Sequence, residues 1–410
     1  MFAKRTLRRI MLFLAVIGPA IITSSADNDA GGIATYAIAG ASCGYALLWS
    51  LLLITPSEAI VQEMAARMGA VTGKGLSALI REEFGVRATF FAMVGLLLAN
   101  LGTTMAEFAG IAAAFEIFGL SKYLSVPLAA LLIWWLVTRG SYSTVEKTLL
   151  ALCSALFAYI VSGLMVGPPW GQVLRGTLIP SLRPDSNYIL LLIASFGTTL
   201  TPWMQFYLQS TITEKGITLR DYPYTRLEVV FGALFSNLVS WFIIVTTAAT
   251  LFAHGISVES AADAALALAP VAGEYAGALF AIGLLGASTL AAAVLPISTA
   301  YAICEAFGWE RGINCNFEEA PFFYGLYTGL IVIGAAAVLL PSIPLVPVMW
   351  LSQVANGILL PVILILMIRL ANSRRIMGNH VNGRLSNVVA WFTAVFVALA
   401  TVALLVSGFF

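Results

Sequence analysis

Long apolar runs alternate with short polar or charged segments along the whole chain. Each run holds about 20 mostly apolar residues, the length that crosses a bilayer as a helix. The pattern predicts an all-α integral membrane protein, and no signal-peptide cleavage pattern follows the first run, so we expect that run to be retained. The predicted spans are eleven: 12–42, 45–66, 89–118, 123–138, 146–167, 188–213, 228–253, 266–304, 321–341, 346–369 and 387–409.

Composition supports this class and excludes others. Of the 410 residues, 60% are hydrophobic and 10% are charged, whereas soluble domains have about 45–50% apolar and about 25% charged residues. An aqueous core cannot absorb that excess, which excludes a cytosolic enzyme, a disordered regulator and a secreted disulfide scaffold. The net charge of +1 argues against a nucleic-acid partner.

The placement of the basic residues predicts the topology. With the N-terminus in the cytoplasm, the eleven spans assign 18 of the 21 Lys and Arg residues to cytoplasmic segments. Only Lys122, Arg175 and Arg183 fall in external segments. This asymmetry follows the positive-inside rule. We therefore expect a multi-pass protein of the plasma (inner) membrane, with a cytoplasmic N-terminus and an external C-terminus.

Halfway along the first span, residues 24–32 read S-S-A-D-N-D-A-G-G. Paired glycines and Ser, Asp and Asn side chains disfavour a continuous helix. Irregular backbone at that depth is tolerated where it lines a cavity or is buried in protein. Asp27 and Asp29 with unwound carbonyls would offer hard oxygen ligands to a hard cation. The simpler alternative is a polar kink between packed helices.

A second predicted break lies in the sixth span, where residues 197–205 read G-T-T-L-T-P-W-M-Q. Pro202 removes a helix hydrogen bond and clashes with the preceding turn. The two breaks lie in the first spans of two successive blocks of five spans. Because five is odd, the second block would run inverted in the membrane. Broken helices at corresponding positions of inverted repeats mark a transporter's midplane site. We expect one transmembrane domain over 1–410, with repeats at 12–167 and 188–369 and an eleventh helix at 387–409.

The other acidic side chains in spans are less specific. Glu107 lies deep in its span without a basic neighbour in sequence, and Glu58 follows Pro56 and can line a cavity. Glu63 and Glu116 lie near span ends, where a solvated face is the simpler interpretation. The cysteines, Cys43, Cys153, Cys304 and Cys315, show no metal-binding spacing, and the histidines, His254 and His380, fall in predicted loops.

Several ordered segments then resemble the Nramp divalent-metal transporters over nearly the whole chain. Residues 18–19 (G-P) and 29–35 (D-A-G-G-I-A-T) are similar to that family's G-P…D-P-G-N-I-A-T segment. Further matches are 64–74 (M-A-A-R-M-G-A-V-T-G-K), 106–107 (A-E) with Gly110, 352–354 (S-Q-V) with 360–361 (L-P), and 373–379 (S-R-R-I-M-G-N) with 382–384 (N-G-R). The resemblance implies a leucine-transporter-type fold with alternating access around an ion held by helices one and six.

Three positions depart from the family pattern. Gly32 stands where the family has a ligand Asn, 201–203 (T-P-W) stand where it has M-P-H, and Thr104 replaces a third-helix Asp. The alignment of this sequence with the family pattern through the break can shift by one residue, because residues 207–210 (Y-L-Q-S) can equally anchor it. Loss of a thioether relaxes selection for soft metals, and loss of titratable groups argues against proton coupling. The pattern resembles the Nramp-related magnesium transporters.

We therefore expect alternating-access transport of hydrated Mg²⁺, and of Mn²⁺, without proton coupling, by a monomer that needs the lipid bilayer and no cofactor. The expected metal site comprises Asp29, Ala26, Gly32, Gly197, Thr198, Thr201 and Trp203. The expected cavity-lining or water-holding residues are Asp27, Gln205, Gln353 and Glu107. Trp203 has helix packing as its alternative role.

Three other functions are weighed against this expectation. A proton-coupled Mn²⁺/Fe²⁺ importer of the Nramp type is the first alternative. An amino-acid permease is disfavoured because Asp29 would repel a substrate carboxylate. A receptor or a membrane enzyme is disfavoured because no nucleophile–base pair is visible.

Overall fold

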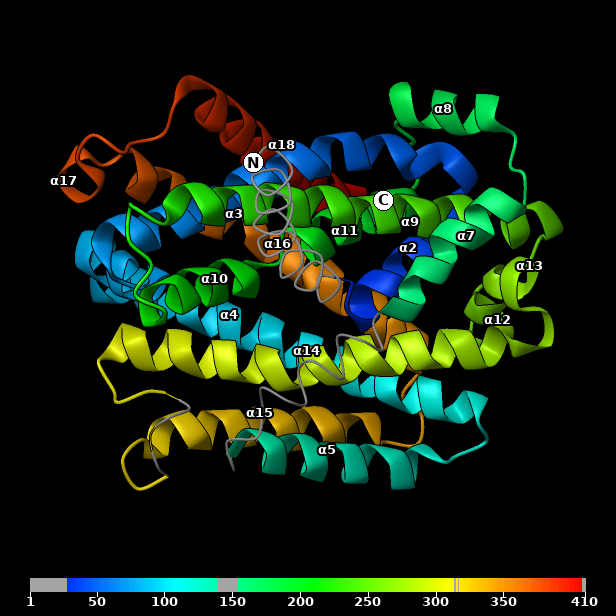
Figure 1. Ribbon diagram of the computed structural model, residues 1–410, viewed down its shortest axis with the longest axis horizontal. Helices are drawn as coiled ribbons and strands as arrows, with labels where there is room; N and C mark the ends of the chain where they lie inside the picture. The colour runs from blue at the N-terminus through cyan, green and yellow to red at the C-terminus, as the bar shows by residue number, and fades with distance from the viewer. Residues whose placement is uncertain (1–27, 139–153, 313–314, 316, 408–410) are drawn as a thin grey trace, which may run out of the picture.

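The computed structural model describes residues 28–138, 154–312, 315 and 317–407, and all of its regular elements there are helical. Figure 1 shows most of the long helices running side by side along the longest axis of the molecule. Eight helical runs in this part of the chain are long and apolar enough to cross a membrane, and α5 (Lys122–Thr138) is a shorter apolar helix. The prediction of an all-helical membrane protein is confirmed.

The first half of the chain forms α2 to α8. After α2 (Ala30–Cys43) a 3₁₀ turn, η1 (Gly44–Leu47), leads directly into α3, so the run Ala30–Thr72 contains two helices. The other elements before the middle of the chain are α3 (Leu48–Thr72), α4 (Leu76–Ile117), α5, η2 (Ser154–Phe157), α7 (Ala158–Met165) and α8 (Trp170–Leu178).

The second half of the chain contains the remaining helices. Its elements are α9 (Ser186–Thr199), α10 (Pro202–Glu214), α11 (Tyr222–Thr250), η3 (Phe252–His254), α12 (Ala261–Ala265), η4 (Leu266–Leu268), α13 (Ala269–Ala272), η5 (Gly273–Tyr275), α14 (Ala276–Phe307), α15 (Pro321–Val338), α16 (Leu345–Asn372), α17 (Arg374–Met377) and α18 (Arg384–Ser407).

Four predicted boundaries were wrong by a turn or more. The span placed at 45–66 ends later, at Thr72, and the span placed at 228–253 starts earlier, at Tyr222. The span placed at 89–118 starts earlier, because α4 begins at Leu76 and continues through a kink at Gly85, whose φ of 78° suits glycine. The span placed at 266–304 starts later, at Ala276. Gly273, with a φ of 53°, ends the short helix α13 before it. Parts of the spans predicted at 12–42 and 146–167 lie outside the described residues.

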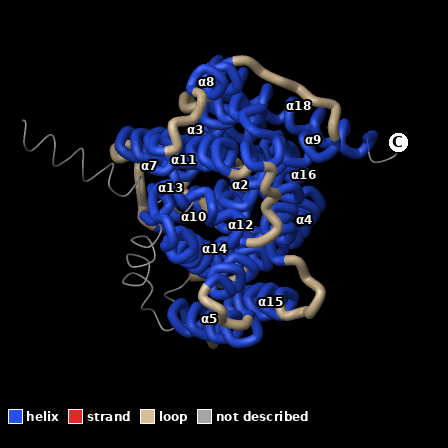
Figure 2. Tube along the Cα trace, turned by 90° about the vertical axis from the view of Figure 1, so that its right-hand side faces the viewer, coloured by secondary structure: helices blue, strands red, loops and turns tan. Residues whose placement is uncertain are grey.

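The helices pack in two groups. α11 packs closely on α2 and α3, and α10 also packs on α3, whereas α4 packs closely on α14, α15 and α16. In Figure 1, α14, α15 and α5 form the lower layer, and Figure 2 shows the same layer from the side. α16 packs on both α4 and α9 and therefore lies between the groups. This arrangement places the starts of α2 and α10 and the end of α9 in the interior.

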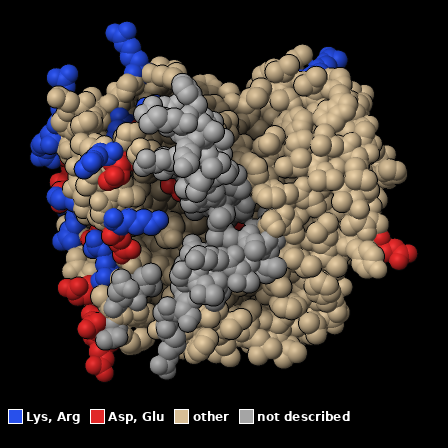
Figure 3. Space-filling view, in the orientation of Figure 1, with Lys and Arg blue, Asp and Glu red and all other residues tan. Residues whose placement is uncertain are grey.

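Charged residues gather at one end of the molecule. Figure 3 shows most Lys, Arg, Asp and Glu residues of this face at the left, the end where Figure 1 places α17. The right-hand part of the face carries few charged residues. The predicted cytoplasmic segments after α3 and after α16 belong to this charged end, although the direction of the chain in the membrane stays a prediction.

Candidate metal site

Asp29 lies directly before the first residue of α2 and caps that helix. Its extended backbone (φ −67°, ψ −179°) leaves the helix, and its Oδ1 accepts a hydrogen bond from the Gly32 N–H at 2.6 Å. The side chain caps α2 because Asp is a strong N-cap residue and carries a negative charge at the positive end of the helix dipole. Asp29 is only 2% exposed, so this carboxylate is held inside the protein.

Glu107 from α4 reaches the same helix start. Its Oε2 accepts a hydrogen bond from the Ala30 N–H at 3.2 Å, one residue after Asp29. Glu107 is fully buried, and its other oxygen, Oε1, has no hydrogen-bond partner in the structure. Two carboxyl groups from separate helices therefore meet at the first turn of α2.

Among the described residues, no basic side chain forms an ion pair with Asp29 or Glu107. The four ion pairs found among the described residues involve Glu63, Glu82, Glu83 and Glu305, and neither Asp29 nor Glu107. A buried carboxylate is costly unless it is paired, hydrogen-bonded or bound to an ion. One backbone N–H to each carboxyl group offsets only part of this cost. The pair is therefore a candidate cation ligand, because carboxylate oxygen is a preferred ligand for Mg²⁺, Ca²⁺ and Mn²⁺.

Gln353 from α16 lies between α2 and α9. A Cβ atom added at Gly31 would be 1.8 Å from Gln353 Nε2, and one added at Gly197 would be 2.0 Å from the Gln353 carbonyl oxygen. Only glycine at these two positions permits such close approach. Nε2 of Gln353 has no hydrogen-bond partner, while its Oε1 accepts from Asn356 Nδ2 at 2.9 Å. The predicted cavity residue thus contacts both helix ends.

The sixth predicted span is interrupted at Leu200 and Thr201, between α9 and α10. α9 ends when the Leu200 N–H bonds to the Phe196 carbonyl at 2.9 Å, and α10 starts with Pro202. The carbonyls of the last turn, including those of Gly197 and Thr198, have no further helical turn to bond to. The Thr198 hydroxyl is buried without a hydrogen-bond partner, and Thr201 is the N-cap of α10 without a side-chain cap bond.

Trp203 and Gln205 lie in the first turn of α10. The Trp203 side chain is buried with Nε1 unpaired, its ring packs 6.2 Å from that of Tyr207, and its carbonyl accepts from Ser298 Oγ at 3.2 Å. Both side-chain polar atoms of Gln205 are buried without a partner. Neither residue is hydrogen-bonded to Asp29. Their unpaired polar atoms are places where water can bind.

The other predicted site residues divide into two cases. Ala26 and Asp27 lie outside the described residues, as does the 18–19 motif. Gly32 is buried and donates its N–H to Asp29, which positions the carboxylate; a direct role for Gly32 at a metal stays a prediction.

Sequence reasoning missed several polar partners of the site. Asn356, one helical turn after Gln353, donates to Thr103 Oγ1 on α4 at 2.9 Å, so a chain of side chains links α16 to α4. Asn28, beside Asp29, accepts from Ser240 on α11 at 3.0 Å. The i, i+3 spacing of Gln353 and Asn356 on one helix face could have signalled the first of these.

The remaining carboxylates are accounted for by other contacts. Glu58 is fully buried and accepts from Gln62 Nε2 at 2.9 Å and from Asn237 Nδ2 at 2.5 Å. Glu63 pairs with Arg67 at 3.3 Å, and Glu116 is exposed near the end of α4. The expectation of a solvated face therefore suits Glu116 and not Glu63.

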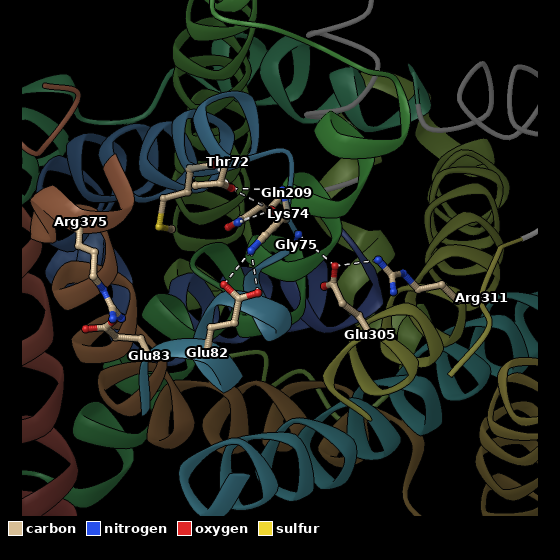
Figure 4. A network of polar contacts seen from close by, with 10 residues as sticks. Thr72, Lys74, Gly75, Glu82, Glu83, Gln209, Glu305, Arg311 and Arg375 are labelled. Carbon is tan, nitrogen blue, oxygen red and sulfur yellow. Dashed lines mark hydrogen bonds and ion pairs between the residues drawn. The ribbon is translucent and has the colours of Figure 1, made fainter. Parts of the chain in front are cut away.

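The turn between α3 and α4 is tied to two other helices at the charged end (Figure 4). Glu305 on α14 accepts from the Gly75 N–H at 3.0 Å and from Ser77 Oγ at 2.6 Å, and it pairs with Arg311 at 2.9 Å. Gln209 on α10 donates to the Lys74 carbonyl at 2.9 Å. These bonds hold the ends of α4, α10 and α14 together on one side of the site.

The arrangement of helices matches known transporters. The chain superposes with a TM-score of 0.63 on MhsT, solved with L-phenylalanine, at 16% identity and 95% coverage of this chain and 98% of that chain. The Eremococcus coleocola manganese transporter gives a TM-score of 0.73 at 24% identity, covering 94% of this chain and 85% of that one. The chain is therefore an all-helical membrane protein with the LeuT fold.

The family follows from the sequence comparison. The family model described as natural resistance-associated macrophage protein-like matches residues 20–407, so the chain belongs to the Nramp family of divalent-metal transporters. The Deinococcus radiodurans divalent metal cation transporter MntH is 29% identical over 96% of this chain and 89% of its own length. The protein of the same name from Erwinia tasmaniensis is 33% identical, covering 67% of this chain and 68% of its own length. The chain is a transporter, not an enzyme.

Proposed function

We propose that this transporter carries divalent cations through a site formed by Asp29, Glu107 and the carbonyl end of α9. The observation that carries the proposal is the pair of buried carboxyl groups at the start of α2 with no basic partner among the described residues. Two such groups are balanced by one divalent ion. The interrupted segment between α9 and α10 supplies the unpaired oxygens expected at a transporter's midplane site.

Mn²⁺ is the first ion that we propose as substrate. The similar Eremococcus coleocola protein is titled a manganese transporter, and Mn²⁺ accepts carboxylate, carbonyl and water ligands. This favours the Nramp-type alternative over magnesium as the main substrate.

Mg²⁺ is a second candidate, and a specific observation supports it. Gly32 offers no side-chain oxygen beside Asp29, and the unpaired buried atoms of Thr198, Gln205 and Gln353 are neutral oxygen and nitrogen atoms. Mg²⁺ dehydrates reluctantly and keeps several waters when bound. Polar atoms that can hold water around the two carboxyl groups therefore suit it.

Flux in proteoliposomes tests both ions. The purified protein is reconstituted with an internal metal-sensitive dye and an internal pH dye, and Mn²⁺ or Mg²⁺ is added outside under a negative-inside potential, worth about 2.3 kcal/mol per elementary charge per 100 mV. We expect saturable uptake that Asp29→Ala abolishes and Glu116→Gln, at an exposed carboxylate, leaves unchanged. Mn²⁺ uptake with acidification but no Mg²⁺ uptake would identify a proton-coupled manganese importer. Normal flux of both ions in folded Asp29→Ala would refute the site.

A further inference from the structure

A groove of about 490 Å³ lies on the outside of the helix bundle, between α9 and α18, far along the chain from the metal site residues of α2. Its walls are Ile189 and Leu192 of α9 and Phe396, Leu399 and Ala400 of α18, and Arg183 lies in the wall formed by the preceding loop. Both helices belong to runs long and apolar enough to cross a membrane. We therefore expect the groove to face lipid hydrocarbon.

The loop that carries Arg183 is fixed on both sides. Ser181 Oγ donates to the Ala46 carbonyl at 2.9 Å, and the Tyr188 hydroxyl donates to the carbonyls of Ser181 and Ala46. On the other side Asp185 caps α9 by accepting the Tyr188 N–H at 3.0 Å. The loop therefore holds Arg183 at the groove before any ligand binds.

Arg183 has a charge that no described residue neutralises. It takes part in none of the four ion pairs in the described part of the chain, and it is exposed. Apolar contact alone gives a lipid chain little preference for a protein groove, because the surrounding tails are equally apolar. The selective contact must then come from the head group, and a guanidinium binds a phosphate with paired, charge-assisted hydrogen bonds.

We propose that this groove binds one anionic phospholipid, with an acyl chain along α9 and α18 and its phosphate on Arg183. A head group of net negative charge is favoured over a zwitterionic one, because the latter carries its own ammonium group to neutralise the phosphate. The bound lipid would contact α9 near its C-terminal end, which forms part of the proposed metal site. The Phe396 ring packs 5.3 Å from the ring of Phe196, which directly precedes Gly197.

Native mass spectrometry of the whole detergent-purified protein tests the binding. Phosphatidylglycerol and phosphatidylcholine are added separately, and the fraction of protein with bound lipid is measured for the wild type and for each variant. The variants are Arg183→Gln, Ala400→Trp and Arg175→Gln. The last is the control, because Arg175 is a basic residue of α8 outside the groove. We expect the wild type to prefer phosphatidylglycerol. Arg183→Gln should lower that affinity about fivefold, which is the equivalent of about 1 kcal/mol, and Ala400→Trp should lower it by filling the groove.

Two results would overturn the proposal. One is equal retention of the two lipids by the wild type, and the other is unchanged phosphatidylglycerol retention in an Arg183→Gln protein with a normal size-exclusion profile. A further effect on transport rests on the proposed function: Mn²⁺ uptake should respond to phosphatidylglycerol content in the wild type and not in Arg183→Gln. Because lipid retention is read without any metal, its result stands whether or not metal transport is found.

Discussion

Replacing Gly31 by Ala would displace the Gln353 side chain of α16, which lies against α2 at this position. The added Cβ would stand 1.8 Å from Nε2, 2.7 Å from Cδ and 2.9 Å from Cγ of Gln353. Ordinary van der Waals contact begins at about 3.4 Å, so the Gln353 amide must move by more than 1.5 Å, the difference between 3.4 and 1.8 Å. Overpacking of this kind costs about 1–3 kcal/mol.

The same substitution at Gly197 provides a matched contrast. There the Cβ would be 2.0 Å from the Gln353 carbonyl oxygen and 2.5 Å from the Gly357 nitrogen. Both are backbone atoms of α16, which cannot be removed by shortening a side chain. Gln353→Ala should therefore restore stability to Gly31→Ala and give no comparable rescue to Gly197→Ala.

Thermal unfolding of the detergent-purified variants, followed by size-exclusion chromatography after heating, measures these costs. We expect Gly31→Ala to lower the apparent melting temperature and the Gly31→Ala/Gln353→Ala protein to match Gln353→Ala alone. This corresponds to a coupling energy within the range of about 0.5–3 kcal/mol found for residues in contact. Additive losses in the double variant, or equal rescue of Gly197→Ala, would show that Gln353 does not lie against Gly31 as the structure places it.

Three further predictions concern charged residues. Glu107→Gln should raise the KM for Mn²⁺ uptake in proteoliposomes about tenfold or more, because it removes one of the two buried carboxyl groups proposed to bind the ion, whereas Glu116→Gln should not change it. Arg67→Gln should lower the melting temperature strongly, because its buried guanidinium bonds three acceptors in the segment between α16 and α18; a loss under about 1 kcal/mol would contradict this. Glu305→Ala should speed amide hydrogen exchange at the start of α4, where it binds the N–H of Gly75, and unchanged exchange there would contradict the capping role.

The sequence was sufficient for the class of protein, and it identified Asp29 as the charged centre of the proposed site. Apolar runs of bilayer length require helices, and Asp29 stood out because a carboxylate inside such a run is costly. The Pro202 position likewise marked the interruption before α10. These signals are local in the chain, so a single sequence carries them.

The features of the site and fold that the sequence did not predict depend on contacts between segments far apart in the chain. The Glu107 bond to Ala30 joins residues 77 positions apart, and no periodicity in α4 tells which face meets the start of α2. The need for glycine at position 31 was not predicted for the same reason, since the lack of a side chain there matters only because Gln353 of α16 lies against it. The start of α14 was misplaced because the apolar pattern continues through the short helices before it.

The electrostatics of the proposed site are consistent with a divalent ion as its ligand. Asp29 and Glu107 each accept one backbone N–H from the first turn of α2, and the helix end contributes about half a positive charge. This offsets part of the pair's charge in the empty protein, so the carboxylates need not be neutralised completely between transport cycles. A monovalent ion would leave one buried charge uncompensated, whereas a divalent ion balances both. Since the N–H groups of the helix end compete for the same oxygens, we expect the proposed site to hold an ion less tightly than two carboxylates without these hydrogen bonds would.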